Sequence, residues 1–133
     1  MTPEQHLNRI PYAAFLGLKA LDAPDGLSVA MPFTDHLIGN PFLPALHGGA
    51  TAAMLEITAI VQMAATHPQP DLPRPINVTV TYLRPGRPLD LLARATISKA
   101  GRRVAHVTAA AWHQDPSRPV ATLSAHFLFA ASL

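Results

Sequence analysis

The chain has 133 residues, of which 49% are hydrophobic and 14% are charged, with a formal charge of +2 and no cysteine. These values predict one folded domain over residues 1–133 and exclude a disordered chain. The lack of cysteine excludes disulfides, thiolate chemistry and cysteine-based zinc sites, and the scattered arginines do not favour nucleic-acid binding.

Neither a leader peptide nor a membrane span is expected. Residues 1–18 contain no basic segment followed by an apolar run. The longest apolar stretch, around residues 48–65, is interrupted by Glu56 and Gln62. We therefore expect a cytoplasmic protein without membrane contact.

Short elements are predicted before residue 47. Thr2 suits a helix N-cap and Pro3 suits the first helical position. Two apolar runs flank a turn-forming segment, and glycine and prolines then predict a loop. The expected elements are a helix over 2–15, strands over 16–21 and 27–33 with a turn at 22–26, and a loop over 34–46.

Residues 48–66 predict one long helix, because apolar residues cover nearly every face of this segment. A helix that is apolar all round is surrounded by other structure. Four prolines between residues 68 and 75 prevent the helix from continuing.

The apolar period then changes to two, which predicts strands. The expected strands cover residues 76–83, 89–99, 103–113 and 119–130. Short turns between them predict an antiparallel meander, and only the helix over 48–66 can cover one of its faces. The predicted fold class is α+β, with an antiparallel sheet of about six strands wrapped around one long central helix.

Glu56 is the candidate catalytic carboxylate, since it lies in the middle of this apolar helix and the chain has only one other glutamate. Burial among apolar residues raises the pKa of a carboxyl group toward the range of a useful base. The structural alternative is an exposed Glu56, or one paired with an arginine such as Arg94.

His47, Gly48 and Gly49 precede the helix and favour the catalytic interpretation. Two glycines at a helix start allow a ligand to approach the backbone, where free N–H groups lie at the positive end of the helix dipole. Such a site can hold a developing oxyanion. Glu56 follows Gly48 by eight residues, or about 12 Å of helical rise, so an extended thioester can lie between them.

The His-Gly-Gly motif, with an acidic residue nine positions after the histidine, resembles the phenylacetate-pathway type of hotdog-fold acyl-CoA thioesterase, a member of the 4-hydroxybenzoyl-CoA thioesterase superfamily. The strand and turn over residues 77–85 are similar to the family's strand after the central helix. Residues 101–104 resemble its later turn. The resemblance covers roughly residues 16–129.

This resemblance implies hydrolysis of an acyl-CoA thioester. Glu56 would be nucleophile or general base, the Gly48 N–H would polarise the carbonyl, and His47 would orient the thioester. The resemblance also implies edge-to-edge pairing of two copies, with the site between them, as a homodimer or a dimer of dimers. The further implied site residues are Asn40 for catalysis, and Gly49, Asn77, Arg84, Arg102 and Arg103 for substrate and coenzyme A. We expect no cofactor beyond the coenzyme A of the substrate.

No metal site is expected, because the other histidines lack metal-ligand spacing. Two alternatives to hydrolysis stay open. One is a dehydratase acting on an acyl thioester, which is disfavoured because His-Gly-Gly opens the helix. The other is a non-catalytic acyl-CoA-binding subunit. It is favoured by Pro41 and Pro75, which stand where the family often has asparagine and a hydroxyl residue. The acyl group is left open.

Overall fold

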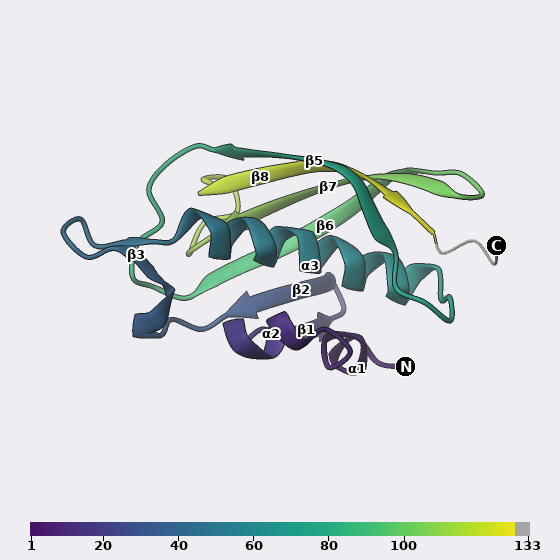
Figure 1. The fold of residues 1–133 in the computed structure, drawn as a ribbon, viewed down its shortest axis with the longest axis horizontal. Helices are drawn as coiled ribbons and strands as arrows, with labels where there is room; N and C mark the ends of the chain where they lie inside the picture. Colours follow the sequence, from purple (N-terminus) through teal and green to yellow (C-terminus); the bar gives the residue numbers. More distant parts are fainter. Residues whose placement is uncertain (130–133) are drawn as a thin grey trace.

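The computed structural model describes residues 1–129 and shows a curved six-stranded antiparallel sheet wrapped around one long helix (Figure 1). The elements in chain order are α1 (Pro3–Leu7), α2 (Pro11–Leu16), β1 (Lys19–Ala23), β2 (Gly26–Met31), the 3-10 turn η1 (Asp35–Leu37), β3 (Ile38–Asn40), β4 (Ala45–Leu46), α3 (Gly48–Thr66), β5 (Arg74–Tyr82), β6 (Leu91–Ala100), β7 (Val104–Trp112) and β8 (Ala121–Leu128). The predicted fold class and the predicted bounds of the central helix are confirmed. The predicted end of the last strand, Ala130, lies outside the described residues.

The strand order in the sheet is β1-β2-β6-β7-β8-β5. The prediction of a four-stranded meander is therefore wrong for β5, which pairs with β8 and leaves β6 to pair with β2. The short segment between β5 and β6 crosses from one edge of the sheet to its centre. As a result β5 is an edge strand, and β1 forms the other edge.

Small side chains let α3 lie close against the inner face of the sheet. The inner positions of β6, β7 and β8 are largely alanines, including fully buried Ala93, Ala111 and Ala125. Met54, Leu55 and Met63 of α3 fill the space above them, and all three are fully buried. Dense packing of this kind supplies most of the stabilisation of such a helix.

The N-terminal prediction needs two corrections. The expected single helix over 2–15 is split, because Pro11 has no N–H to continue α1 and holds Ile10 in an extended conformation. Helix α2 then runs to Leu16 and ends at Gly17, whose φ of 75° is left-handed. The first strand therefore begins at Lys19 and not at Leu16.

The segment predicted as loop over 34–46 contains η1 and a small hairpin. Strands β3 and β4 pair through Ile38 with Leu46 and through Asn40 with Ala45. The Leu46 N–H donates to the Gly86 carbonyl at 2.9 Å, which anchors the hairpin to the segment between β5 and β6. The loop between the two strands projects from the body of the protein (Figure 1), and its Phe42 and Leu43 are exposed.

Helix α3 is long and apolar enough to cross a membrane by length and composition, and 61% of its apolar window is buried inside the protein. The core helix of a soluble protein meets the same criterion. The expectation of a cytoplasmic location stays a prediction.

Candidate active site

His47 is the N-cap residue of α3, and its hydrogen bonds hold the first turn of the helix in place. Its N–H donates to the Leu37 carbonyl at 2.8 Å, and its ring Nδ1 accepts the Gly49 N–H at 2.9 Å. Because Nδ1 is the acceptor, the proton of the neutral ring lies on Nε2. The exposed imidazole therefore presents an N–H donor to a ligand at the helix start.

The two glycines differ in what they offer to a ligand. The Gly49 N–H is already bonded to His47, so the expectation that both N–H groups are free is wrong for Gly49. The Gly48 N–H has no hydrogen-bond partner among residues 1–129. It lies at the positive end of a 19-residue helix and is available to an oxyanion.

Tyr82 at the end of β5 holds the peptide group that joins Gly48 to Gly49. Its hydroxyl donates to the Gly48 carbonyl at 2.7 Å. A Cβ added at Gly48 would lie 3.3 Å from the Tyr82 hydroxyl oxygen, so any larger residue would crowd the ring. Gly39 is constrained even more tightly, because its Cβ would lie 2.7 Å from the His47 Cα.

An open pocket of about 410 Å³ lies at this helix start. Gly48, Thr51 and Tyr82 line it on one side, and Leu43 of the hairpin tip lines it on another. Arg84 lies at its margin. The pocket thus combines an apolar wall, a free backbone N–H and a cation, which suits a thioester attached to an anionic carrier.

Glu56 is partly buried in α3, and burial raises the pKa of its carboxyl group above the ordinary value. It forms no ion pair within residues 1–129. The structural alternative of a pair with Arg94 is excluded, because Arg94 bonds Ser28 and forms an ion pair of 3.3 Å with Asp25. An unpaired carboxylate with a raised pKa is a candidate base or nucleophile.

The structure brings one of the two predicted asparagines near the helix start. Asn40 lies in β3, and its side-chain Oδ1 accepts the Phe42 N–H at 3.0 Å, which leaves its amide donors available. Asn77 lies on the outer face of the sheet, where its Oδ1 is 3.0 Å from His126 Nδ1. Asn77 is therefore on the opposite side of its sheet from α3.

The predicted arginines lie at two ends of the sheet. Arg84 reaches the pocket at Gly48, and its guanidinium donates to the Pro119 carbonyl. Arg102 and Arg103 lie in the turn between β6 and β7, at the end where α3 terminates (Figure 1). Within one copy of the chain they do not share a site with Gly48.

Sequence reasoning missed a second group of basic residues. Arg87 and Arg118 line a pocket of about 300 Å³ that shares Arg84 with the pocket at Gly48. His113 braces this loop, because its Nε2 accepts the Arg87 N–H at 3.0 Å and its Nδ1 lies 2.9 Å from the Asp90 carbonyl oxygen. The three arginines are spread from residue 84 to residue 118, so no local sequence signal groups them.

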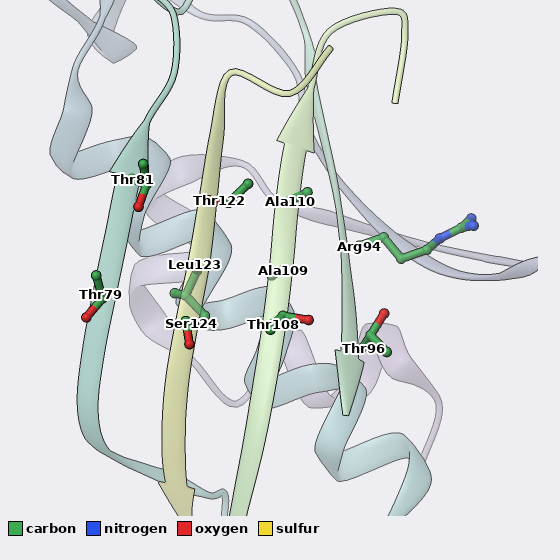
Figure 2. Close-up of a pocket in the computed structure, with 10 residues that line it drawn as sticks. All are labelled: Thr79, Thr81, Arg94, Thr96, Thr108, Ala109, Ala110, Thr122, Leu123 and Ser124. Carbon is green, nitrogen blue, oxygen red and sulfur yellow. The ribbon is translucent and has the colours of Figure 1, made fainter. Parts of the chain in front are cut away.

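Another hollow, of about 380 Å³, lies on the outer face of the sheet (Figure 2). Hydroxyl side chains lie directly opposite one another across its strands, as Thr79, Ser124, Thr108 and Thr96. Its lining contains no carboxylate and no imidazole. The pocket at Gly48 also lacks both groups in its lining, but it lies at the start of the helix that carries Glu56 and the free Gly48 N–H, so we assign the candidate site to α3.

Comparison with known proteins identifies the family and the fold of the chain. The sequence pattern of the acyl-CoA thioesterase N-terminal domain matches residues 40–128, which is more than half of the chain. No protein of curated function matches the sequence.

Solved structures share the fold over nearly the whole chain. A protein from Chromobacterium violaceum is 34% identical with a TM-score of 0.77, over 96% of this chain and 88% of that chain. A Bacillus halodurans protein solved with CoA is 22% identical with a TM-score of 0.81, over 97% and 87%. A phenylacetic acid degradation-related protein from Ralstonia eutropha is 24% identical with a TM-score of 0.80, over 96% and 100%. The chain therefore belongs to the acyl-CoA thioesterase family and has the hotdog fold.

Proposed function

We propose that this thioesterase hydrolyses acyl-CoA to the free acid and coenzyme A, with Glu56 as the catalytic carboxylate and the Gly48 N–H as the oxyanion donor. The observation that carries the proposal is an unpaired, partly buried carboxylate on the same helix whose start presents a free N–H group. His47 Nε2–H and the Asn40 amide are additional donors to the thioester carbonyl.

Two routes fit these residues. In the first, a Glu56 oxygen bonds to the carbonyl carbon, the C–S bond breaks, and water hydrolyses the resulting anhydride. In the second, Glu56 takes a proton from water as the water oxygen attacks the carbonyl, and the CoA thiolate leaves. The negative charge on the carbonyl oxygen is stabilised by the Gly48 N–H in either route.

The expectation that one thioester lies between Gly48 and Glu56 of the same helix does not hold for a single copy, and we propose a site formed by two copies of the chain. Glu56 and Gly48 are separated by about 12 Å of helical rise, whereas both must lie about 3 Å from one thioester carbonyl. A glutamate side chain does not span that gap. We propose that the Gly48 of one copy acts with the Glu56 of a second copy.

The exposed edge strand β5 is the proposed contact between the copies. Eight of its nine residues are exposed, and an unpaired edge of this length invites pairing with another strand. Antiparallel pairing of β5 with its own copy is isologous and closes the edge. Tyr82 contacts Gly48, so these two residues lie at the same height along β5. A two-fold axis that brings Glu56 of the second copy to this height must cross β5 about two residues before Tyr82, near Val80.

The arginines are proposed to bind the phosphates of coenzyme A. Arg84, Arg87 and Arg118, with one carboxylate at Asp115, line a pocket that shares Arg84 with the pocket at Gly48. Arginine donates paired hydrogen bonds to phosphate. Antiparallel pairing of β5 reverses the second copy end for end. It thereby moves Arg102 and Arg103 of that copy toward the same end as Gly48. The Bacillus halodurans relative solved with CoA supports a coenzyme A ligand.

The decisive experiment measures thiol release from a panel of acyl-CoA substrates by the wild type, Glu56→Gln and Glu4→Gln. Glu4 is the only other glutamate, and its carboxylate accepts the Ala20 N–H, a bond that glutamine can retain. Glu56→Gln should fall by about a hundredfold or more while Glu4→Gln keeps full turnover. Full activity of Glu56→Gln would refute its catalytic role. A wild type that binds CoA esters without turnover would favour the non-catalytic binding subunit.

A further inference from the structure

The hairpin tip before α3 exposes two large apolar side chains. Phe42 is 96% exposed and Leu43 is 68% exposed. Pro41 and Pro44 flank them and restrict the backbone, and the Phe42 N–H is bonded to Asn40 at 3.0 Å. The tip is therefore held in a defined conformation although most of its apolar surface is exposed.

The tip lies at one end of the β5 edge. Leu43 lines the pocket at the start of α3 together with Tyr82 and Leu83, which come from the end of β5 and the residue after it. Leu83 is itself 49% exposed. This end of the edge thus carries an apolar surface without a partner in the same copy.

A second apolar surface lies at the other end of the same strand. Ile76 is 54% exposed and Val78 is 38% exposed. Val78 shares the helix side of the sheet with Val80, which packs against the core, because alternate residues of a strand face the same side. Helix α3 contacts β6 and β7 more than β5, and both Ile76 and Val78 stay partly exposed.

We infer that the Phe42–Leu43 tip of one copy packs against Ile76 and Val78 of the other copy and walls the acyl pocket of the shared site. This inference rests on the proposed function, in which β5 pairs with its own copy. Antiparallel pairing about an axis near Val80 places Val78 of one copy opposite Tyr82 of the other, beside the tip. Each copy then covers the apolar surface of its partner at both ends of the edge.

The wall is of the kind that accepts an apolar acyl group. The four side chains are hydrocarbon, and one of them, Leu43, lines the pocket at Gly48, where the thioester carbonyl is proposed to bind. A short acyl group such as acetyl ends near the carbonyl and does not reach the tip. The tip residues therefore select for larger apolar acyl groups and leave the chemistry of the carbonyl unchanged.

The contact is tested by cross-linking, for which the absence of cysteine gives a clean background. The double variant Phe42→Cys/Ile76→Cys is treated with a short bismaleimide and analysed on a denaturing gel. The tip lies beside Tyr82, which is six strand residues, or about 20 Å, from Ile76. This distance within one copy is too long for the cross-linker, so a cross-link must join two copies. The control is Leu21→Cys/Ile76→Cys, since Leu21 is 47% exposed on the opposite edge strand β1.

Dimer-sized product from the test pair and none from the control is the expected result. Light scattering separates the remaining outcomes. If the protein is a dimer in solution but gives no cross-link, the inferred tip contact is wrong and the proposed dimer stands. If the protein is a monomer, both the tip contact and the proposed dimer are wrong. Loss of binding to phosphatidylcholine vesicles in Phe42→Ala, without any cross-link, identifies a lipid surface as the partner and also overturns the inference.

The effect on substrate choice is tested with Phe42→Ala. We expect kcat/KM to fall about tenfold for the best large apolar acyl-CoA and less than about twofold for acetyl-CoA. An equal fall for both substrates would show that the tip does not contact the acyl group. Thermal unfolding monitored by circular dichroism confirms that the variant is folded.

Discussion

The contact between Tyr82 and Gly48 joins edge strand β5 to the start of α3, and the effect of removing it can be worked out from the structure. Tyr82→Phe removes one hydrogen bond of 2.7 Å at a side chain that is 54% exposed. Such a bond contributes about 0.5–1 kcal/mol. For 133 residues the entropy of unfolding is about 0.28 kcal/mol/K, so the midpoint temperature of thermal unfolding should fall by about 2–4 °C.

Gly48→Ala acts on the same contact from the other side. The new Cβ would lie 3.3 Å from the Tyr82 hydroxyl oxygen and 3.4 Å from two ring carbons, which weakens the hydrogen bond. Alanine also favours the helix by up to about 1 kcal/mol, so the net change in stability should be below about 1 kcal/mol in either direction. Activity should fall about a hundredfold, because the crowding against Tyr82 shifts the backbone at position 48 and moves its N–H away from the proposed oxyanion.

A double-mutant cycle tests this reasoning, with urea unfolding followed by the single, buried Trp112 and activity followed by thiol release. Phenylalanine at position 82 removes the oxygen that lies closest to the new Cβ. The losses of unfolding free energy in Tyr82→Phe and Gly48→Ala should therefore sum to more than the loss in the double variant. Additive changes within about 0.3 kcal/mol would refute the contact as the cause of both effects.

Three further predictions follow from Glu56, His6 and Gly39. Burial raises the pKa of Glu56, so the ionised carboxylate destabilises the folded state at pH values above that pKa. In urea unfolding at pH 8, Glu56→Gln should therefore be more stable than the wild type. The difference in unfolding free energy should shrink as the pH falls to 4.5. Burial, and then the charge of Arg9, lower the pKa of His6 below 6.5. The unfolding free energy of the wild type should therefore be highest above pH 6.5 and decline as the pH falls below it. His6→Phe should flatten this dependence of stability on pH, and an unchanged slope would exclude His6 as its cause. Gly39→Ala should lower the unfolding free energy by about 1–3 kcal/mol, because its Cβ would lie 2.7 Å from the His47 Cα, and wild-type stability would contradict that close approach.

The sequence alone was sufficient where the signal is local. The bounds of α3 match the prediction because its start is marked by His47 and two glycines and its end by the prolines after His67. The late strands were recognisable from a period of two in apolar residues. The resemblance to the family rests on the His-Gly-Gly motif with Glu56 nine positions after His47 and on the segments 77–85 and 101–104, and the sequence pattern of the family confirms it.

Only the tertiary structure decided which strands pair and which side chains meet. The pairing of β5 with β8 joins residues about 50 positions apart, and no local pattern favours it over pairing with β6. The same pairing turns Asn77 to the outer face and brings Tyr82 to Gly48. The pairing of β6 with β7 places Arg102 and Arg103 at the far end of the sheet. These contacts depend on how the chain closes over long distances, and a strand's own sequence specifies its period but not its neighbour.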